Sequence, residues 1–374
     1  MIIHVVTAGE TVISIAERYQ VPAWTIIYNN ELRSPDSLAV GQALLILGAG
    51  DAPVRLNLRA EAYAYPFTRT ELLHEAFPAI RTVLSFSVGF TEDGRLLPFD
   101  DVAVRELAAA YGLPVMLVLT PLSPSGTFNN QLVHAVSTNP QTKEKLIGEL
   151  LTRVRMFGYA GVDVDCEYIL REDREGYAAF VSDLRSAMNA EGFLVSVALA
   201  PKTSDDQPGL LYEGMDYALL GAAANQVLLM TYEWGYTYGP AMAVAPLNMV
   251  RAVAEYAVTR IPPEKIFMGI PNYAYDWVLP YIKGQSRATT IGNVDAVQIA
   301  VENDAQILYD ETAQTPHFTY IRNEIMHEVW FEDVRSIDAK LHLAAEFGFQ
   351  GVTYWNLLKP FRANWELIQQ VLNQ

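Results

Sequence analysis

Cysteine is nearly absent from this chain, which carries only Cys166 among its 374 residues. One cysteine excludes a disulfide framework and any metal site built from several cysteines. Basic residues are also scarce, because 26 Lys and Arg stand against 43 Asp and Glu, for a formal net charge of −17. So acidic a chain argues against nucleic acid and anionic membranes as partners.

Long apolar runs are missing as well. No stretch approaches the ~18 consecutive apolar residues of a membrane span, and we expect no membrane insertion. The N-terminal residues have neither a basic start nor a long apolar core, so we expect no conventional secretion signal. Hydrophobic residues nevertheless make up 51% of the chain and charged residues 18%, which excludes a disordered protein.

Residues 1–48 predict a small module of their own. A short strand at residues 3–6 precedes Thr11, which can cap a helix, and a second helix follows Pro22 before a closing strand at residues 44–47. This βααβ pattern resembles a LysM domain in its segments GET (9–11), IAERY (15–19), NN (29–30) and VGQAL (40–44).

The resemblance implies that residues 1–48 bind N-acetylglucosamine glycans such as peptidoglycan or chitin. In the family the sugar lies between the first strand–helix turn and the second helix–strand turn. The implied contacts are therefore Gly9, Glu10, Thr11 and Val12, facing a loop at residues 33–40. The alternative is a small βααβ domain without a ligand.

Residues 49–53 read as a Gly/Pro linker, and strands and helices alternate over residues 54–374. The strand segments are short apolar runs without polar alternation, which is typical of parallel strands covered on both faces. Eight such strand–helix units predict an α/β fold, a (β/α)8 TIM barrel, with an open doubly wound sheet as the second choice. The eight predicted strands are Leu56–Tyr63, Thr82–Val88, Val115–Leu119, Gly161–Asp165, Val195–Ala200, Val227–Thr231, Ile266–Ile270 and Gly351–Trp355.

About 80 residues separate the seventh and eighth predicted strands, far more than one helix needs. Within them His317–Tyr320 and Glu328–Phe331 predict antiparallel strands, and Val294–Asn303 predicts a short helix. We interpret residues 281–333 as an α+β insertion before strand 8 that builds one wall of a cleft.

Three acids alternate along the fourth predicted strand. Asp163, Asp165 and Glu167 lie two residues apart and therefore share one face, about 6.6 Å per step. Buried without a basic partner, they must share protons or bind a metal, and at least one should stay protonated near neutral pH. Glu167 ends the strand, where barrels place their catalytic groups, so it is the natural general acid. Cys166 points to the opposite face, and we expect a buried, inert thiol.

A metal site is the alternative for the acid row. The six histidines form no H-x-x-x-H pair, and none lies near the row in sequence. We therefore expect neither a metal nor another cofactor.

The acid row resembles the active-site strand of the family 18 glycoside hydrolases, whose motif is D-x-x-D-x-D-x-E. Residues 160–167 read AGVDVDCE, so Ala160 replaces the first, supporting Asp and puts proton sharing deep in the barrel in doubt. Glu233 follows Tyr232 where the family has M-x-Y-D, and Trp355 matches the tryptophan under the reacting sugar. Within the family, residues 200–203, 230–236, 240–246 and 269–273 resemble the spore-cortex-lytic N-acetylglucosaminidases.

The resemblance implies retaining, substrate-assisted catalysis. Glu167 would be the acid and base, Asp165 would bind the acetamido N–H, Asp163 would hold Asp165, and Tyr232 would orient the acetamido carbonyl. The candidates for substrate binding are Trp355, Glu233, Asn272, Tyr273, Tyr63 and Phe86.

The predicted function is cleavage of β-1,4 bonds after N-acetylglucosamine in peptidoglycan, in fragments of spore cortex. The alternatives are a chitinase acting on chitin or chitooligosaccharides, and a non-catalytic glycan-binding protein of the spore coat. We expect a monomer associated with the spore or the cell wall. Endo or exo action and a requirement for muramic-δ-lactam stay open at this point.

Overall fold

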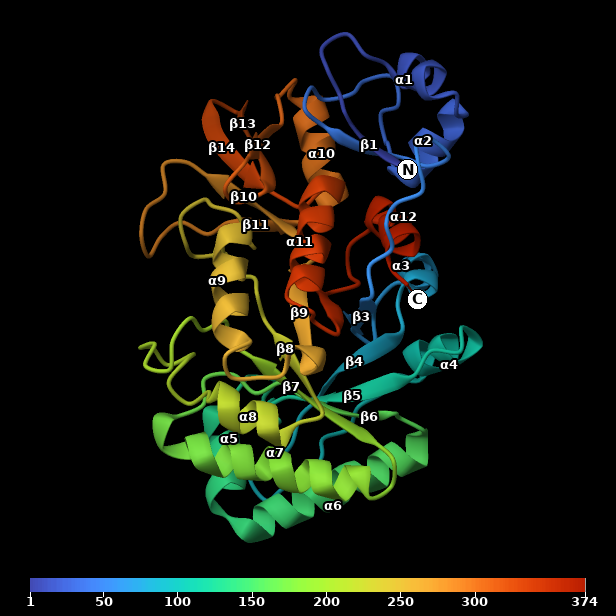
Figure 1. The fold of residues 1–374 in the computed structure, drawn as a ribbon. Helices are drawn as coiled ribbons and strands as arrows, with labels where there is room; N and C mark the ends of the chain where they lie inside the picture. Colours follow the sequence, from blue (N-terminus) through green and yellow to red (C-terminus); the bar gives the residue numbers. More distant parts are fainter. Residues whose placement is uncertain (374) are drawn as a thin grey trace.

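Eight parallel strands close into a barrel in the order β15-β3-β4-β5-β6-β7-β8-β9 (Figure 1). The structure is a computed structural model and describes residues 1–373. The predicted TIM barrel is confirmed, and the open sheet is excluded because β15 pairs with both β3 and β9. The barrel strands are β3 (Arg59–Ala64), β4 (Thr82–Val88), β5 (Val115–Leu119), β6 (Gly161–Val164), β7 (Leu194–Leu199), β8 (Gln226–Leu229), β9 (Ile266–Pro271) and β15 (Gly351–Trp355).

Helices wrap the outside of the barrel, and their sequences carry the expected caps. In α6 (Pro140–Phe157) the Asn139 side chain accepts hydrogen bonds from the backbone N–H groups of Gln141 and Thr142, and Gly158 ends the helix with φ at 71°. The other helices of this layer are α3 (Thr70–Ala76), α4 (Val102–Ala110), α5 (Asn130–Thr138), α7 (Arg174–Asn189), α8 (Tyr217–Ala223), α9 (Leu247–Ala257), α11 (Val334–Glu346) and α12 (Arg362–Val371), with single turns η1 (Phe77–Ala79), η2 (Arg171–Asp173) and η3 (Pro263–Lys265).

A five-stranded antiparallel sheet and α10 (Asn293–Glu302) form the insertion between β9 and β15. The insertion begins earlier than residue 281, because β10 (Ala274–Val278) leaves the barrel and pairs with β14, placing Asp276 opposite Val329. The sheet order is β11-β10-β14-β13-β12, with β11 (Thr289–Ile291), β12 (Leu308–Asp310), β13 (Thr315–Arg322) and β14 (Ile325–Trp330).

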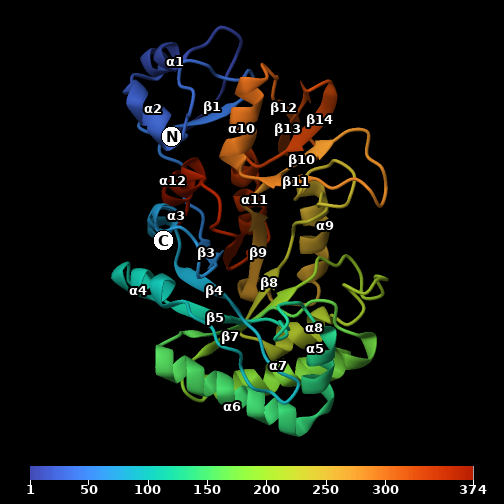
Figure 2. The same cartoon turned by 180° about the vertical axis from the view of Figure 1, so that it is seen from behind.

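The N-terminal module has the predicted βααβ order, with β1 (Ile2–Val5), α1 (Val12–Tyr19), α2 (Ala23–Asn29) and β2 (Ala43–Ile46). The Thr11 side chain caps α1 by accepting from the backbone N–H of Ser14. Figures 1 and 2 both place this module beside α10 and above α12, so it lies against the insertion and the last helix of the barrel. Within residues 1–373, no helix combines the length and the apolar character needed to cross a membrane.

Candidate active site

The acid row lies on β6 and its C-terminal extension, and it points into the barrel. Asp163 is 1% exposed and is held by two hydroxyl donors, Tyr63 at 2.8 Å from Oδ2 and Ser196 at 2.5 Å from Oδ1. Burial raises the pKa of Asp163, and these two hydrogen bonds oppose the rise. Asp163 is therefore fixed in position from both sides, by β3 and by β7.

Asp165 sits one step higher and has a free oxygen. Its Oδ1 is buried and has no hydrogen-bond partner among the described residues. Burial first, and then the charges of Glu167 and Asp163, raise the pKa of Asp165 well above its usual range. A buried acceptor without a donor costs free energy that a substrate N–H could recover.

Glu167 stands at the mouth of the barrel. Burial, and then the charge of Glu233, raise the pKa of its carboxyl, which favours the protonated form that a general acid requires. No ion pair within residues 1–373 joins a cation to Asp163, Asp165 or Glu167.

Tyr232 and Glu233 follow β8. Tyr232 is buried, and its pKa is raised by burial and then by the charge of Asp165, which places the phenol beside the acid row. Gly269 on β9 makes room for its ring, since a Cβ there would lie 2.7 Å from the ring edge. Glu233 has φ at 69° and accepts hydrogen bonds from the hydroxyls of Tyr273 and Tyr275, the latter at 3.0 Å.

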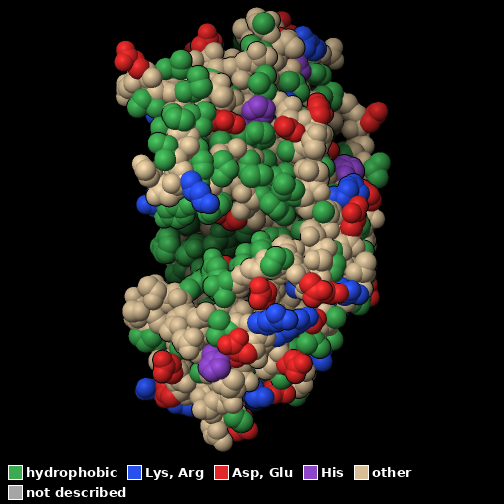
Figure 3. Space-filling model, turned by 90° about the vertical axis from the view of Figure 1, so that its left-hand side faces the viewer, with side chains coloured by type: hydrophobic (Ala, Val, Ile, Leu, Met, Phe, Trp, Pro, Cys, Tyr) green, Lys and Arg blue, Asp and Glu red, His purple; other side chains and the backbone are tan. Residues whose placement is uncertain are grey.

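Aromatic side chains surround the acids. The Trp355 ring centroid lies 4.8 Å from that of Phe86 and 5.1 Å from that of Tyr63, each pair edge to face. Trp355 and Glu233 also line a pocket of about 150 Å³ together with Tyr273, Tyr275 and Lys359. Figure 3 shows a recess in the molecular surface whose walls are mostly hydrophobic side chains.

Not every candidate for substrate binding is open to a ligand. Asn272 is 1% exposed, and its amide donates to the backbone carbonyls of Asn356 and Lys359, so it ties two loops together. The Tyr63 hydroxyl is committed to Asp163, and Phe86 is buried behind Trp355. Substrate binding by these three residues stays a prediction.

The sequence reasoning missed three side chains that lie beside the candidate site residues. Ser196 lies directly opposite Asp163 on β7, so strand register could have found it. Glu61 shares the inner face with Tyr63 and accepts a hydrogen bond from Thr353 at 2.7 Å. Tyr275 belongs to the insertion sheet, and no local signal connects it with Glu233.

In the N-terminal module the predicted contact residues form the turn before α1. Gly9 has φ at 83°, and Glu10 accepts from the backbone N–H of Thr7 and pairs with His4 and Arg18. Val12 is buried, so only the backbone and the Thr11 region of this turn are open to a ligand.

Metal chemistry has no obvious site in the described part of the chain. Across residues 1–373, no group of three or more His, Cys, Asp and Glu is arranged to hold an ion. Cys166 is buried as predicted, and burial raises the pKa of its thiol.

Comparison with known proteins identifies both parts of the chain. The sequence profile described as Glycosyl hydrolases family 18 matches residues 111–359, and the LysM domain profile matches residues 4–46. The chain belongs to glycosyl hydrolase family 18. It is a glycosidase with an N-terminal LysM domain, as the sequence predicted.

Three proteins similar to this family 18 glycosidase are named as cortex-lytic enzymes. It is 34% identical to the cortical fragment-lytic enzyme of Bacillus subtilis (strain 168), covering 100% of this chain and 98% of the relative. The crystal structure of the Bacillus megaterium QM B1551 spore cortex-lytic enzyme SleL matches with a TM-score of 0.92 and 31% identity, covering 99% of this chain and 98% of that one. The SleL of Bacillus cereus matches with a TM-score of 0.81 and 33% identity, covering 99% and 86%.

Proposed function

We propose that this chain is an N-acetylglucosaminidase that cleaves β-1,4 bonds after N-acetylglucosamine in spore-cortex peptidoglycan. The names of its relatives support the substrate, and the family supports a mechanism in which the substrate's own acetamido group is the nucleophile. Its place of action is then the spore cortex or cell wall.

In the first step Glu167 donates its proton to the glycosidic oxygen while the acetamido oxygen attacks C1. The C1–O bond breaks, the protonated leaving sugar departs, and a cyclic oxazolinium ion remains in the site. The raised pKa of Glu167 supports this role, because the carboxyl must hold its proton near neutral pH.

In the second step the Glu167 carboxylate takes a proton from water, and the water oxygen attacks C1 from the face that the leaving group vacated. The two inversions retain the configuration at C1. Trp355 supplies an aromatic floor for the sugar ring in both steps.

The observation that carries the proposal is the free Oδ1 of Asp165. It lies between Asp163, which two hydroxyls immobilise, and Glu167 at the mouth of the barrel. An acceptor placed there fits the acetamido N–H, and it stabilises the positive charge that develops on that nitrogen. Tyr232 beside it fits the acetamido carbonyl.

Digestion of purified cortex fragments tests the proposal, with chitohexaose in parallel and Glu167→Gln as the inactive control. We expect fragments with new reducing N-acetylglucosamine ends from the wild type, and a loss of about 10²–10⁴-fold in rate in the variant. Proton NMR of the fresh product should show the β-anomer first.

Three results would count against the proposal. Cleavage of chitohexaose alone would make the protein a chitinase, and an initial α-anomer would exclude the acetamido mechanism. Cortex binding without cleavage of either substrate would make it a glycan-binding protein.

A further inference from the structure

A small pocket beside Trp355 carries a cation without a partner. Its volume is about 150 Å³, and Glu233, Trp355 and Lys359 are among the residues that line it. Sites for whole small molecules occupy about 300–1,000 Å³, so this pocket has room for a substituent of a sugar rather than for a further sugar unit. Because Trp355 is the proposed floor for the reacting sugar, the substituent belongs to a glycan bound in the same cleft.

The two charged groups of this lining differ in their partners. The Glu233 carboxylate accepts hydrogen bonds from the hydroxyls of Tyr273 and Tyr275. Lys359 is partly buried, and it joins no ion pair within residues 1–373. The partner that this pocket lacks is therefore an acceptor for Lys359, and the strongest acceptor for an ammonium group is an anion.

The backbone of Lys359 is held in place by its neighbours. The buried Asn272 amide donates to the carbonyl oxygens of Asn356 at 2.9 Å and of Lys359 at 3.0 Å. Within the same loop, the Asn356 side chain accepts from the Leu358 N–H at 3.1 Å. A loop that is already ordered lowers the entropy cost of placing the ammonium group against a ligand.

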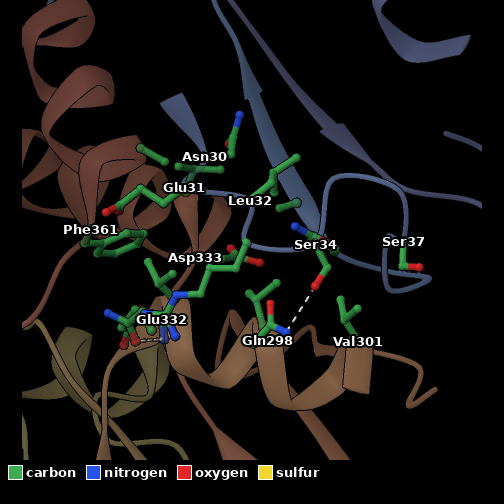
Figure 4. A pocket seen from close by; sticks show the side chains of 18 residues that line it. Asn30, Glu31, Leu32, Ser34, Ser37, Gln298, Val301, Glu332, Asp333 and Phe361 are labelled. Atoms are coloured by element: carbon green, nitrogen blue, oxygen red, sulfur yellow. Dashed lines mark hydrogen bonds between the residues drawn. The ribbon is translucent and has the colours of Figure 1, made fainter. Parts of the chain in front are cut away.

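The cation of another pocket provides a contrast. Arg33 lines a gap of about 50 Å³ between the LysM domain and α10, where Figure 4 shows Gln298 reaching Ser34. The Arg33 guanidinium already pairs with Asp295 at 2.8 Å. That cation has a partner within the protein, whereas Lys359 has none among the described residues.

Peptidoglycan and chitin differ in the substituents of their sugars. Both contain N-acetylglucosamine, but every second sugar of peptidoglycan is a muramyl sugar, whose O3 carries a lactyl side chain that ends in a carboxyl group. Chitin has only a hydroxyl group there. The side chain stays anionic when a single amino acid is attached to it, and it becomes neutral when it closes to a δ-lactam.

The proposed reaction brings this side chain to the cleft from either direction. Cleavage after N-acetylglucosamine leaves a muramyl sugar on each side of the reacting sugar, because the polymer alternates. Whichever neighbour reaches the pocket beside Trp355 therefore carries the side chain. The pocket does not have to be assigned to one end of the glycan for this argument to hold.

We propose that Lys359 is a specificity-determining residue, which pairs with the carboxylate of the muramyl sugar next to the reacting N-acetylglucosamine. This inference rests on the proposed function, because only peptidoglycan brings such a carboxylate into the cleft. The acid row disfavours an anionic substrate, and a cation in the wall of the same cleft offsets that repulsion.

An NMR titration of the full chain carrying Glu167→Gln tests the inference. The probes are a tetrasaccharide of alternating N-acetylglucosamine and N-acetylmuramic acid, and the same tetrasaccharide with its carboxyl groups converted to carboxamides. The indole N–H signal of Trp355 reports on this pocket and not on the LysM domain. We expect the acidic probe to bind about tenfold more tightly than the neutral probe, and high salt should narrow that difference.

Lys359→Met should weaken binding of the acidic probe about tenfold and leave the neutral probe unchanged. A variant that merely disturbed the loop would affect both probes alike. Lys283→Met is the matched control, because it removes one positive charge at an exposed lysine outside the pocket. It should change the affinity for neither probe.

Equal affinity for the two probes would overturn the inference, as would an equal effect of Lys359→Met on both. A Trp355 signal that responds to neither probe would overturn it as well. Cleavage of cortex fragments is measured separately, in the chain with Glu167 intact. The proposed function fails only if that cleavage is absent, so the two failures are distinguishable.

Discussion

Buried carboxyl groups occur in two kinds of surroundings in this molecule, one with a cation beside the carboxyl group and one without. Glu332 lies 2.9 Å from the Lys340 ammonium, and both side chains are almost fully buried. Burial raises the pKa of Glu332, and Lys340 opposes that rise. Glu61, Asp163 and Asp165 are just as buried in the barrel, yet no ion pair within residues 1–373 involves any of them.

This difference distinguishes a carboxyl group that stabilises the fold from carboxyl groups that are candidates for catalysis. A buried carboxylate that a cation neutralises is committed to the fold, and removing its partner leaves an uncompensated charge. The barrel acids have no such cation beside them: burial raises the pKa values of Asp163 and Asp165, hydroxyl groups alone hold Asp163, and one oxygen of Asp165 has no donor among the described residues. Carboxyl groups with strongly shifted pKa values are typical of functional sites.

The largest effect should come from Lys340→Met, which breaks the neutralised pair. We expect a loss of about 3–5 kcal/mol in the free energy of unfolding, because Glu332 is left buried and unpaired. Urea unfolding measures it. Lys283→Met, at an exposed lysine, is the control and should change stability by less than about 0.5 kcal/mol. Adding Glu332→Met to Lys340→Met should restore most of the lost free energy of unfolding. A Lys340→Met variant as stable as the Lys283→Met control would contradict this account.

Substitution of a barrel acid should lower activity without lowering stability. Asp165→Asn should lower the rate of cleavage about 10²–10³-fold, because in the proposed mechanism the acetamido N–H donates to the Asp165 carboxyl. The free energy of unfolding should stay the same or rise, since a buried acid without a cation is removed. Kinetics on cortex fragments and urea unfolding measure the two quantities. If Asp165→Asn lowered the free energy of unfolding as much as Lys340→Met does, the proposed difference between the two regions would be wrong.

Most of the barrel was predictable because each strand is a local apolar run between turn residues. The onset of the insertion was not, because β10 follows β9 after only two residues and its partner β14 lies about 50 residues further on. Propensity cannot distinguish a strand that continues a barrel from one that leaves it.

The acid row was predictable from its two-residue spacing, whereas its supports were not. Ser196 and Glu61 depend on register between strands, which becomes visible only once the barrel order is fixed. The docking of the LysM domain depends on surfaces that are far apart in sequence, so no local signal marks the close approach of Gly41 to Ile307.

Glu61 offers a smaller test of the same contrast. Burial raises its pKa from 4.5 to about 8, with a further contribution from the charge of Asp163. The native state then holds one proton more than the unfolded state between these values, so the free energy of unfolding falls as pH rises from about 4.5 to about 8. The loss amounts to about 2 kcal/mol from pH 5.5 to 7.

Glu61→Gln should make the measured slope shallower by about 1.4 kcal/mol per pH unit, the contribution of one proton, as measured by urea unfolding at several pH values. Glu106→Gln, at an exposed position, should keep the wild-type slope. A slope that is unchanged in Glu61→Gln would assign the pH dependence to the remaining barrel acids alone.

The smallest effect concerns Glu233, whose charge raises the pKa of Glu167 second only to burial. Glu233→Gln removes that charge, so the pKa of Glu167 should fall. Because the proposed mechanism needs protonated Glu167, the alkaline limb of the kcat profile should move to lower pH. Glu172→Gln, at an exposed carboxyl five residues beyond Glu167, should leave the limb in place. If the alkaline limb of the kcat profile does not move in Glu233→Gln either, burial alone keeps Glu167 protonated. The hydrogen bonds from Tyr273 and Tyr275 then position Glu233 for contact with the substrate.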